Sequence, residues 1–223
     1  MPRFHVRYPD LQIEIRDVAR PTDADARAVD VYVQWGWLDP PANLVRRVIG
    51  QSRFVVCASP GYWAAHGVPL QPMDLERHVC VLFRMPDGAI HDLWQFERDG
   101  QAEAVVARGW LVSSHRDVVL DAALEGQGVA RLTDLTIRGH LRSGRLVPVL
   151  VEWDMRDAPP VDVLYPSNQR RVPRVRLFIE FVTQLFREME AERGERAGAH
   201  LAAQRPRWWA RQGRASVAMG RRE

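Results

Sequence analysis

Apolar residues occur along the chain in short runs whose spacing changes between the two-residue period of strands and the 3.6-residue period of helices. Runs rich in β-branched and aromatic residues predict strands at 11–15, 29–33, 44–49, 53–57, 79–83, 129–132 and 161–165. Further extended segments are predicted around Trp94, at 105–112 and at 146–151, with a turn at Asp99 and Gly100. The run at 53–57 is almost wholly apolar, which is typical of a strand covered on both faces.

Helices are predicted between these strands from capping residues and from helical spacing. In the segment SPGYWAAHG, Ser59 is the expected N-cap, Pro60 occupies the first helical position and Gly67 is the stop signal. Apolar residues at helical spacing predict further helices at 117–125, 135–141 and 172–189. Strands that alternate with helices favour an α/β fold with right-handed crossovers.

The positive charge of the chain is concentrated at its carboxyl end. The 223 residues carry a formal net charge of +3, but residues 193–223 hold eight arginines and two glutamates. That segment therefore has a charge of +6 and leaves residues 1–192 at −3. A mildly acidic body is poorly suited to neutralising phosphates, so we do not expect it to bind nucleic acid by itself.

The Arg-, Ala- and Gly-rich segment 190–223 offers little apolar surface to pack, and we expect a disordered tail there. Its Trp208 and Trp209 among arginines could stack on nucleic acid or sit at an anionic membrane surface. The alternative, which we prefer, is an extension without a role of its own.

Several classes of protein do not fit the sequence. No apolar run approaches the ~18 residues of a membrane helix, and the first ten residues lack the apolar core of a secretion signal, which favours a cytoplasmic location without a membrane partner. Cys57 and Cys80 lie inside apolar runs, so buried thiols are expected rather than a disulfide. The histidines lack metal-ligand spacing, and nucleotide-binding and hydrolase motifs are missing, so we expect no metal, no cofactor and no enzyme.

The order of several segments resembles one known family, the LysR-type transcriptional regulators, in their effector-binding domain. The similar segments are RYPDLQIEI, DVYVQWGWLDPPANLVRRVI, FVVCASPGYWAAHGVPLQPMDLERHVCV, GWLVSSHRDVVLDAALEGQGVARL, LRSGRLVPVL and VLYPSNQRRVPRVRLFIEFV. They cover about residues 1–187 in the family's order, and ASPGYWAAHG and PRVRLFIEF are the most specific of them.

The resemblance implies an α/β, two-lobed fold like the type 2 periplasmic binding proteins, over residues 1–189. Lobe I would take residues 1–57 and 166–187 and lobe II residues 58–165, with the chain crossing near Ala58 and Tyr165, and a small molecule would bind in the cleft. The family's winged helix-turn-helix and the first strand of its effector domain have no counterpart in this sequence. We therefore expect an N-terminally truncated domain in which the strand at 11–15 has lost its central neighbour.

The resemblance and the local pattern select six candidate effector-binding residues at strand ends. Gln34 and Trp35 follow a strand, where the family usually carries an arginine, and would line the cleft or form an ordinary strand-to-loop pair. Phe83 and Arg84 end another strand, and Arg84 would bind a carboxylate or stay solvated. Ser114 and His115 precede the helix at 117–125 and would cap it, bind an anionic effector at its N-terminus, or both.

The function implied is that of an effector-binding domain that senses a small molecule and regulates transcription. DNA contact would be made by a helix-turn-helix outside this chain, in a homodimer or oligomer of full-length regulators. The effector would be a small organic molecule, with an anion as one option. The alternatives are a stand-alone solute-binding module without a DNA-binding role, and a non-functional truncated remnant.

Overall fold

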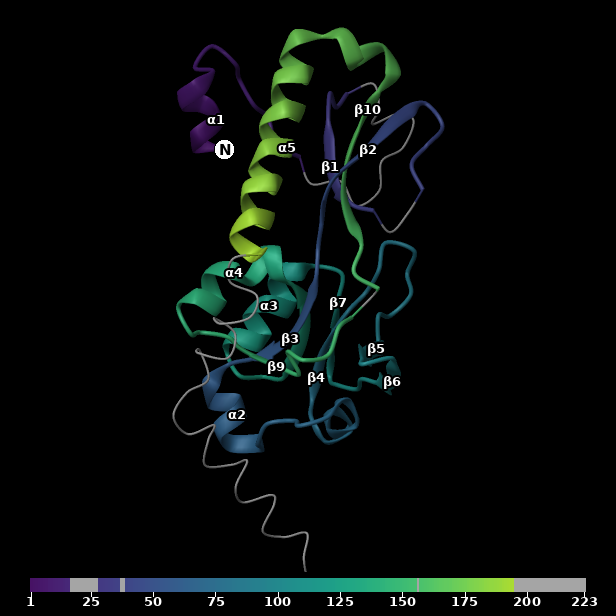
Figure 1. Ribbon diagram of the computed structural model, residues 1–223, viewed down its shortest axis with the longest axis vertical. Coiled ribbons are helices and arrows are strands. Elements are labelled where there is room, and N and C mark those ends of the chain that lie inside the picture. The colour runs from purple at the N-terminus through teal and green to yellow at the C-terminus, as the bar shows by residue number, and fades with distance from the viewer. Residues whose placement is uncertain (17–27, 37–38, 156, 195–223) are drawn as a thin grey trace, which may run out of the picture. The chain divides into compact units, whose positions relative to one another are not determined.

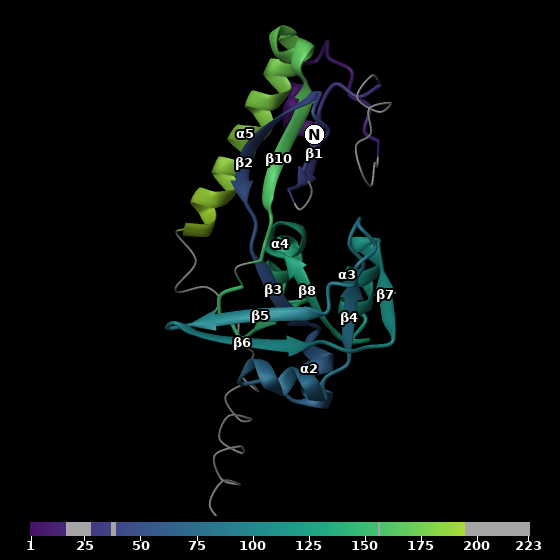
Figure 2. The same ribbon diagram turned by 90° about the vertical axis from the view of Figure 1, so that its right-hand side faces the viewer.

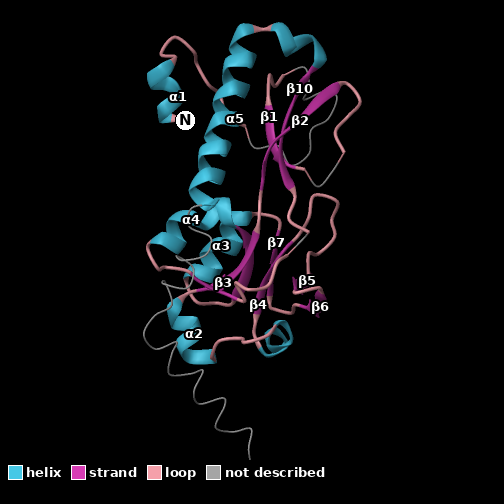
Figure 3. Ribbon diagram, viewed as in Figure 1, coloured by secondary structure: helices cyan, strands magenta, loops and turns pink. Residues whose placement is uncertain are grey.

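The computed structural model describes residues 1–16, 28–36, 39–155 and 157–194 and divides into two compact units (Figure 1). Unit 1 comprises Met1–Ser52 and Pro159–Glu195, and unit 2 comprises Arg53–Ala158. Strands occur along the chain in runs that helices separate, rather than in the strict alternation that the hydrophobic pattern predicts (Figure 3). None of the described helices combines the length and apolar character that a membrane span requires.

Unit 1 is a small antiparallel sheet with helices against it. Its sheet has the order β1-β10-β2, and the long helix α5 packs along β2, where Gly50 lies against the ring of Phe186. Helix α1 is attached to α5 through Phe4, whose buried ring meets Phe178 and Phe181 edge-on. The elements of this unit are α1 (Pro2–Arg7), β1 (Tyr32–Trp35), β2 (Leu44–Gln51), β10 (Pro160–Pro166), η3 (Ser167–Arg171) and α5 (Pro173–Gly194).

Two sequence predictions for unit 1 are wrong. Residues 11–15 do not form a strand: no neighbouring segment among the described residues supplies a ladder partner, and Ile15 is 76% exposed. Helix α5 continues beyond Met189 to Gly194, through residues with good helix propensity. Glu190 in this extension accepts a hydrogen bond at 2.7 Å from the backbone N–H of Gln51. The remainder of the predicted tail, from 195 onward, lies outside the described residues.

Unit 2 contains a five-stranded mixed sheet with the order β7-β4-β8-β3-β9. Strand β4 runs parallel to β7 and β8, whereas β3 runs antiparallel to β8 and β9. A separate hairpin, β5-β6, has antiparallel strands (Figure 2) and turns at Asp99 and Gly100, both with positive φ, as the Asp-Gly sequence predicts. The elements are β3 (Phe54–Ala58), α2 (Pro60–His66), η2 (Pro72–Arg77), β4 (Cys80–Phe83), β5 (Leu93–Arg98), β6 (Gln101–Val106), β7 (Leu111–Ser113), α3 (Arg116–Leu124), β8 (Val129–Thr133), α4 (Asp134–Arg142) and β9 (Val147–Val149).

The sheet of unit 2 is covered on both faces, as the apolar run at 53–57 predicts. Because side chains alternate along a strand, Val56 enters a core with Trp63 and Trp94, while Cys57 enters a second core with Ile137. Cys57 and Cys80 are free thiols, and burial raises the pKa of each to about 12. The prediction of buried thiols is therefore confirmed.

The two points where the chain passes between the units lie at Ser52–Arg53 and Ala158–Pro159. They were expected near Ala58 and Tyr165. The difference follows from strand pairing: β3 is bonded to β8 and β9 and so belongs wholly to unit 2, and β10 is bonded to β1 and β2 and so belongs to unit 1.

Candidate functional site

Four of the six predicted residues meet at one end of the unit 2 sheet. Strands β4 and β7 are parallel neighbours, and Phe83 is paired with Ser113 at their carboxyl ends. The backbone N–H of Arg84 continues this pairing with a hydrogen bond of 2.9 Å to the carbonyl of Ser113. Ser114 and His115 follow directly and lead into α3. Parallel strands place their carboxyl ends at the same edge of a sheet, which is the usual position of a ligand site in α/β proteins.

The N-terminus of α3 lies within this cluster. His115 is the N-cap residue, but its side chain makes no capping bond, and neither does that of Ser114, so the predicted side-chain cap is wrong. Instead, the hydroxyl of Ser113 accepts a hydrogen bond of 3.0 Å from the backbone N–H of His115. The positive end of the helix dipole therefore faces a polar edge, which favours an anion.

Two arginines add positive charge to the same edge. The Arg116 guanidinium stacks over the ring of Phe83, 4.6 Å from its centre, and burial lowers its pKa to about 10. Arg84 is exposed and donates one hydrogen bond, of 2.8 Å, to the carbonyl of Gly88 in its own loop. Arg116 was missed from the sequence because the helix was predicted to begin at residue 117, one residue after this arginine, whereas α3 begins at Arg116 itself.

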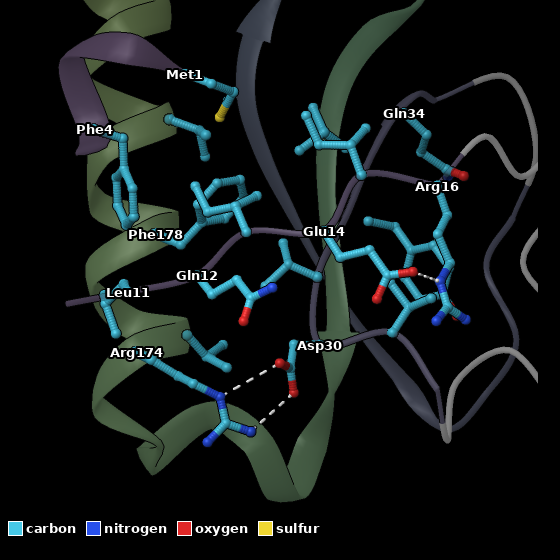
Figure 4. Close-up of a pocket in the computed structure, with 18 of the residues that line it drawn as sticks. Met1, Phe4, Leu11, Gln12, Glu14, Arg16, Asp30, Gln34, Arg174 and Phe178 are labelled. Atoms are coloured by element: carbon cyan, nitrogen blue, oxygen red, sulfur yellow. Dashed lines mark hydrogen bonds and ion pairs between the residues drawn. The ribbon is translucent and has the colours of Figure 1, made fainter. Parts of the chain in front are cut away.

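The other two predicted residues, Gln34 and Trp35, lie in β1 of unit 1 and are both half-buried. Gln34 lines a cavity of about 700 Å³ (Figure 4), whereas Trp35 is not among the described residues that line it. The cavity walls are β1, the extended residues 11–16, α1 and α5, and most of the side chains that face it are apolar. Gln34 therefore contributes one of few amide groups to an apolar space.

Two exposed ion pairs lie at different sides of this cavity (Figure 4). Arg174 binds both carboxylate oxygens of Asp30 at 3.3–3.4 Å. Arg16 donates to Glu14 at 2.7 Å, and this hydrogen bond lowers the pKa of Glu14 and raises that of Arg16. Since each of the two pairs is neutral overall, the charged side chains that line the cavity carry no net charge.

A buried carboxylate fixes the turn after Gln34 and Trp35. Asp162 on β10 is fully buried and forms an ion pair with Arg46 at 2.6 Å, and burial raises its pKa. Arg46 also donates a hydrogen bond of 3.4 Å to the carbonyl of Gly36. A Cβ at Gly36 would lie 2.3 Å from the Asp162 carboxylate, so the turn requires glycine. The signal in the sequence is an aspartate inside the apolar run VDVLY.

Unit 2 contains a second buried ionic cluster that sequence reasoning missed. The Arg131 side chain is 2% exposed and donates to Asp157 at 2.8 Å, while His91 contacts the same oxygen at 3.2 Å. The guanidinium lies over the rings of Phe54 and Trp94, at 4.5 and 5.6 Å from their centres. Burial lowers the pKa of Arg131 to about 10.

Two opposing effects act on the pKa of Asp157. Burial acts to raise its pKa, but the hydrogen bond with His91 and the charge of Arg131 prevail and lower it. The sequence signal is an arginine in the middle of the apolar strand VARLT, but its partners are distant in the sequence.

Comparison with known proteins identifies the chain with one family. The family model described as "LysR substrate binding domain" matches residues 1–187. The probable HTH-type transcriptional regulator LtrA of Klebsiella pneumoniae is 30% identical over 188 residues, which are 82% of this chain and 59% of that protein. The HTH-type transcriptional regulator CrgA of Neisseria meningitidis serogroup C is 29% identical over 182 residues, or 82% of this chain and 60% of the relative. The chain thus spans about three fifths of the length of these curated relatives.

Solved structures agree with the sequence comparison. The regulatory domain of CrgA from Neisseria meningitidis superposes with a TM-score of 0.72 at 26% identity, covering 82% of this chain and 88% of that domain. Full-length AphB, the Vibrio cholerae virulence activator, gives a TM-score of 0.68 at 29% identity, covering 83% of this chain and 62% of that protein. These likenesses confirm the predicted α/β, periplasmic-binding-protein-like fold class. The chain belongs to the LysR substrate-binding domain family.

Proposed function

We propose that this domain binds a small organic anion as the effector of a LysR-type transcriptional regulator. The observation that carries the proposal is the meeting of Phe83, Arg84, His115 and Arg116 at the carboxyl ends of β4 and β7. An uncapped helix N-terminus, two guanidinium groups and an aromatic face together offer hydrogen bonds and charge to a carboxylate, and a surface for its apolar part. The relatives are named as transcriptional regulators, which supports a role in binding rather than in catalysis.

Regulation would follow from a shift between conformations that bind the effector differently. The longer relatives are named HTH-type regulators, and a helix-turn-helix is a part suited to DNA. We propose that this domain acts on transcription through such a part. The regulator would work as an oligomer in the cytoplasm. The acidic body of residues 1–192 supports this division of labour, because it has no excess of cations for phosphates. A mobility-shift titration of this chain with promoter DNA should show no sequence-specific complex at nanomolar concentration.

Ligand titration tests the anion site. Succinate and benzoate are compared with their neutral amides, succinamide and benzamide, by thermal shift and calorimetry. We expect an acid to bind and its amide to bind at least tenfold more weakly, since hydrogen bonds to charged groups contribute about 1.5–3 kcal/mol. Arg84→Gln should weaken acid binding by about tenfold or more.

Arg108→Gln is the matched control for Arg84→Gln. Arg108 is also an exposed arginine of unit 2, but its carbonyl is bonded to the N–H of Cys80, at the opposite end of β4. This variant should leave the affinity for the acid unchanged within twofold. Equal binding of acids and amides, or equal loss in both variants, would contradict the assignment of an anion site to this edge.

A further inference from the structure

The two points where the chain passes between the units are held by the same side chains in unit 2. These points lie at Ser52–Arg53 and Ala158–Pro159, and we call residues 52–54 and 157–159 the two crossing segments. In unit 1, the hydroxyl of Ser52 donates a hydrogen bond of 2.5 Å to the carbonyl of Pro159. The crossing segments therefore lie next to each other although they are far apart in the sequence.

Arg131 on β8 contacts both crossing segments. Its guanidinium lies over the ring of Phe54, 4.5 Å from the ring centre, and donates to the carboxylate of Asp157 at 2.8 Å. The Arg131 side chain is 2% exposed, and its Nη2 is buried with no hydrogen-bond partner among the described residues. A guanidinium buried in this way cannot exchange its partners for water, so it holds the ring and the carboxylate in fixed positions.

His91 contacts the same two residues. Its ring meets that of Phe54 edge-on, with 5.5 Å between the ring centres, and its Nε2 lies 3.2 Å from a carboxylate oxygen of Asp157. The backbone of His91 is fixed on both sides. Its N–H donates to the carbonyl of Phe83 at 2.9 Å, and its carbonyl accepts from the indole N–H of Trp94 at 3.1 Å. Because Phe83 belongs to the proposed anion site, His91 joins that site to both crossing segments.

The stability of unit 2 alone does not account for an arginine at this position. Arg131 is paired with Val56 in the sheet and faces the core that contains Trp94, where an apolar side chain would suit its neighbours. A buried ion pair usually stabilises a fold no more than well-packed apolar residues of the same volume. An arginine, however, binds a ring and a carboxylate at the same time, which an apolar residue cannot do.

We propose that Arg131 and His91 form one anchor for both crossing segments, and that an acid bound at the anion site acts on these segments through His91. Because the two segments share the anchor, loosening one of them loosens the other, and they respond together when the domain changes conformation. The first part of the proposal is independent of the effector, whereas the second part rests on the proposed function. Both residues are positioning residues that act on the crossing segments and not on the effector itself.

Amide hydrogen exchange of the complete 223-residue chain, followed by mass spectrometry of its peptides, tests the anchor. Phe54→Leu removes the ring from the first crossing segment. Exchange in peptides that contain residues 157–158 should then rise about threefold or more, because one cation–π contact accounts for about that factor. Phe54→Tyr keeps the ring and should leave this exchange within about twofold of the native rate. Peptides from β6 should not change in either variant, since a local loosening does not reach them.

Phe96→Leu is the matched control for Phe54→Leu. Phe96 on β5 is buried in the same core as Trp94, but the guanidinium of Arg131 lies over the rings of Phe54 and Trp94. This variant should leave exchange at residues 157–158 within about twofold of the native rate. If circular dichroism shows that Phe54→Leu loses the fold, His91→Gln takes its place. Exchange should then rise in the peptides of both crossing segments.

Benzoate and succinate, the acids of the binding test, show whether the anchor transmits binding. At a saturating concentration, an acid that binds should slow exchange in both crossing segments of the native chain about fivefold or more, the lower end of ordinary coupling between two sites. In His91→Gln the acid should still bind, because Phe83 and Arg84 are unchanged. It should no longer slow exchange in the crossing segments.

Three results would count against the proposal. If Phe54→Leu raises exchange only in residues 52–54, or no more than Phe96→Leu does at 157–158, the segments are held separately and share no anchor. If an acid binds but slows exchange equally in the native chain and in His91→Gln, binding does not act through His91. If neither acid binds, the proposed function and the transmission fail together, whereas the variants without ligand still decide whether the anchor exists.

Discussion

The buried pair Arg131–Asp157 provides a stringent test of how unit 2 is stabilised. Asp157→Asn removes the anion and leaves the guanidinium of Arg131, whose side chain is 2% exposed, without a counter-charge. Breaking a buried pair on one side typically costs 3–5 kcal/mol, because a buried charge remains uncompensated. We expect a loss of about 4 kcal/mol in the free energy of unfolding. With an m-value of about 2 kcal/mol per M, the urea midpoint falls by about 2 M.

The reciprocal change should cost less. In Arg131→Met the buried charge disappears, Asp157 is 25% exposed and retains water, and the thioether occupies the space between Phe54 and Trp94. We expect a loss of about 1–2 kcal/mol, and a double variant Arg131→Met/Asp157→Asn within about 2 kcal/mol of the native chain. The single and double variants form a cycle that isolates the interaction between the two residues.

The assay is urea unfolding followed by tryptophan fluorescence, since Trp63 and Trp94 are buried in unit 2. Expression levels and native circular dichroism serve as controls for the fold. The reasoning is refuted if the double variant is destabilised by the sum of the two single changes, because that result would mean that the pair acts as two independent contacts.

Three further predictions concern backbone crowding, the thiols and acid stability. Gly36→Ala should lower the free energy of unfolding by about 1–3 kcal/mol, because its Cβ would lie 2.3 Å from the Asp162 carboxylate. Gly139→Ala in helix α4 should raise it by about 0.5–1 kcal/mol, because no atom lies within 4 Å of the added Cβ. Thermal melts show whether each change is destabilising or stabilising. The two buried thiols, with pKa values of about 12, should not react with Ellman's reagent at pH 8 unless urea unfolds the chain, and reaction at the native rate of a free thiol would contradict their burial. The pKa of Asp157 is below its ordinary 3.8, so its stabilisation should be complete above that pH and be lost as the pH falls below it; an acid titration by circular dichroism should show a flatter limb in Asp157→Asn.

Local signals predicted local structure well. Ser59 caps α2 by accepting from the N–H of Tyr62 at 3.3 Å, and Gly67 ends that helix with a φ of 82°. The Asp99–Gly100 turn was likewise predictable, because both residues are suited to positive φ. Each of these features depends on a few neighbouring residues and on no distant partner.

Features that depend on distant partners could not be read in the same way. The pattern at 11–15 is that of a strand, but a strand also needs a neighbour to pair with, and none of the described residues supplies one. The ion pair of Asp162 joins residues 116 positions apart, and that of Arg131 joins residues 26 positions apart. The sequence therefore showed only that each of the two is a charged residue within an apolar run, and it did not show the partner. Four of the six candidate site residues lie at one sheet edge, because strand ends and helix starts are local features; their role as effector-binding residues stays a prediction.

The two-sided sheet of unit 2 has a consequence for how substitutions combine. Cys80 and Val81 are adjacent in the chain, but Cys80 belongs to the core of Trp63 and Trp94, and Val81 belongs to that of Ile137. Substitutions can therefore repack one side of the sheet while the other side stays unchanged. Neighbouring residues in β4 would then be substituted independently of each other. Residues that change together would instead be those that share a side, such as Cys80 with Trp63, across a long stretch of sequence.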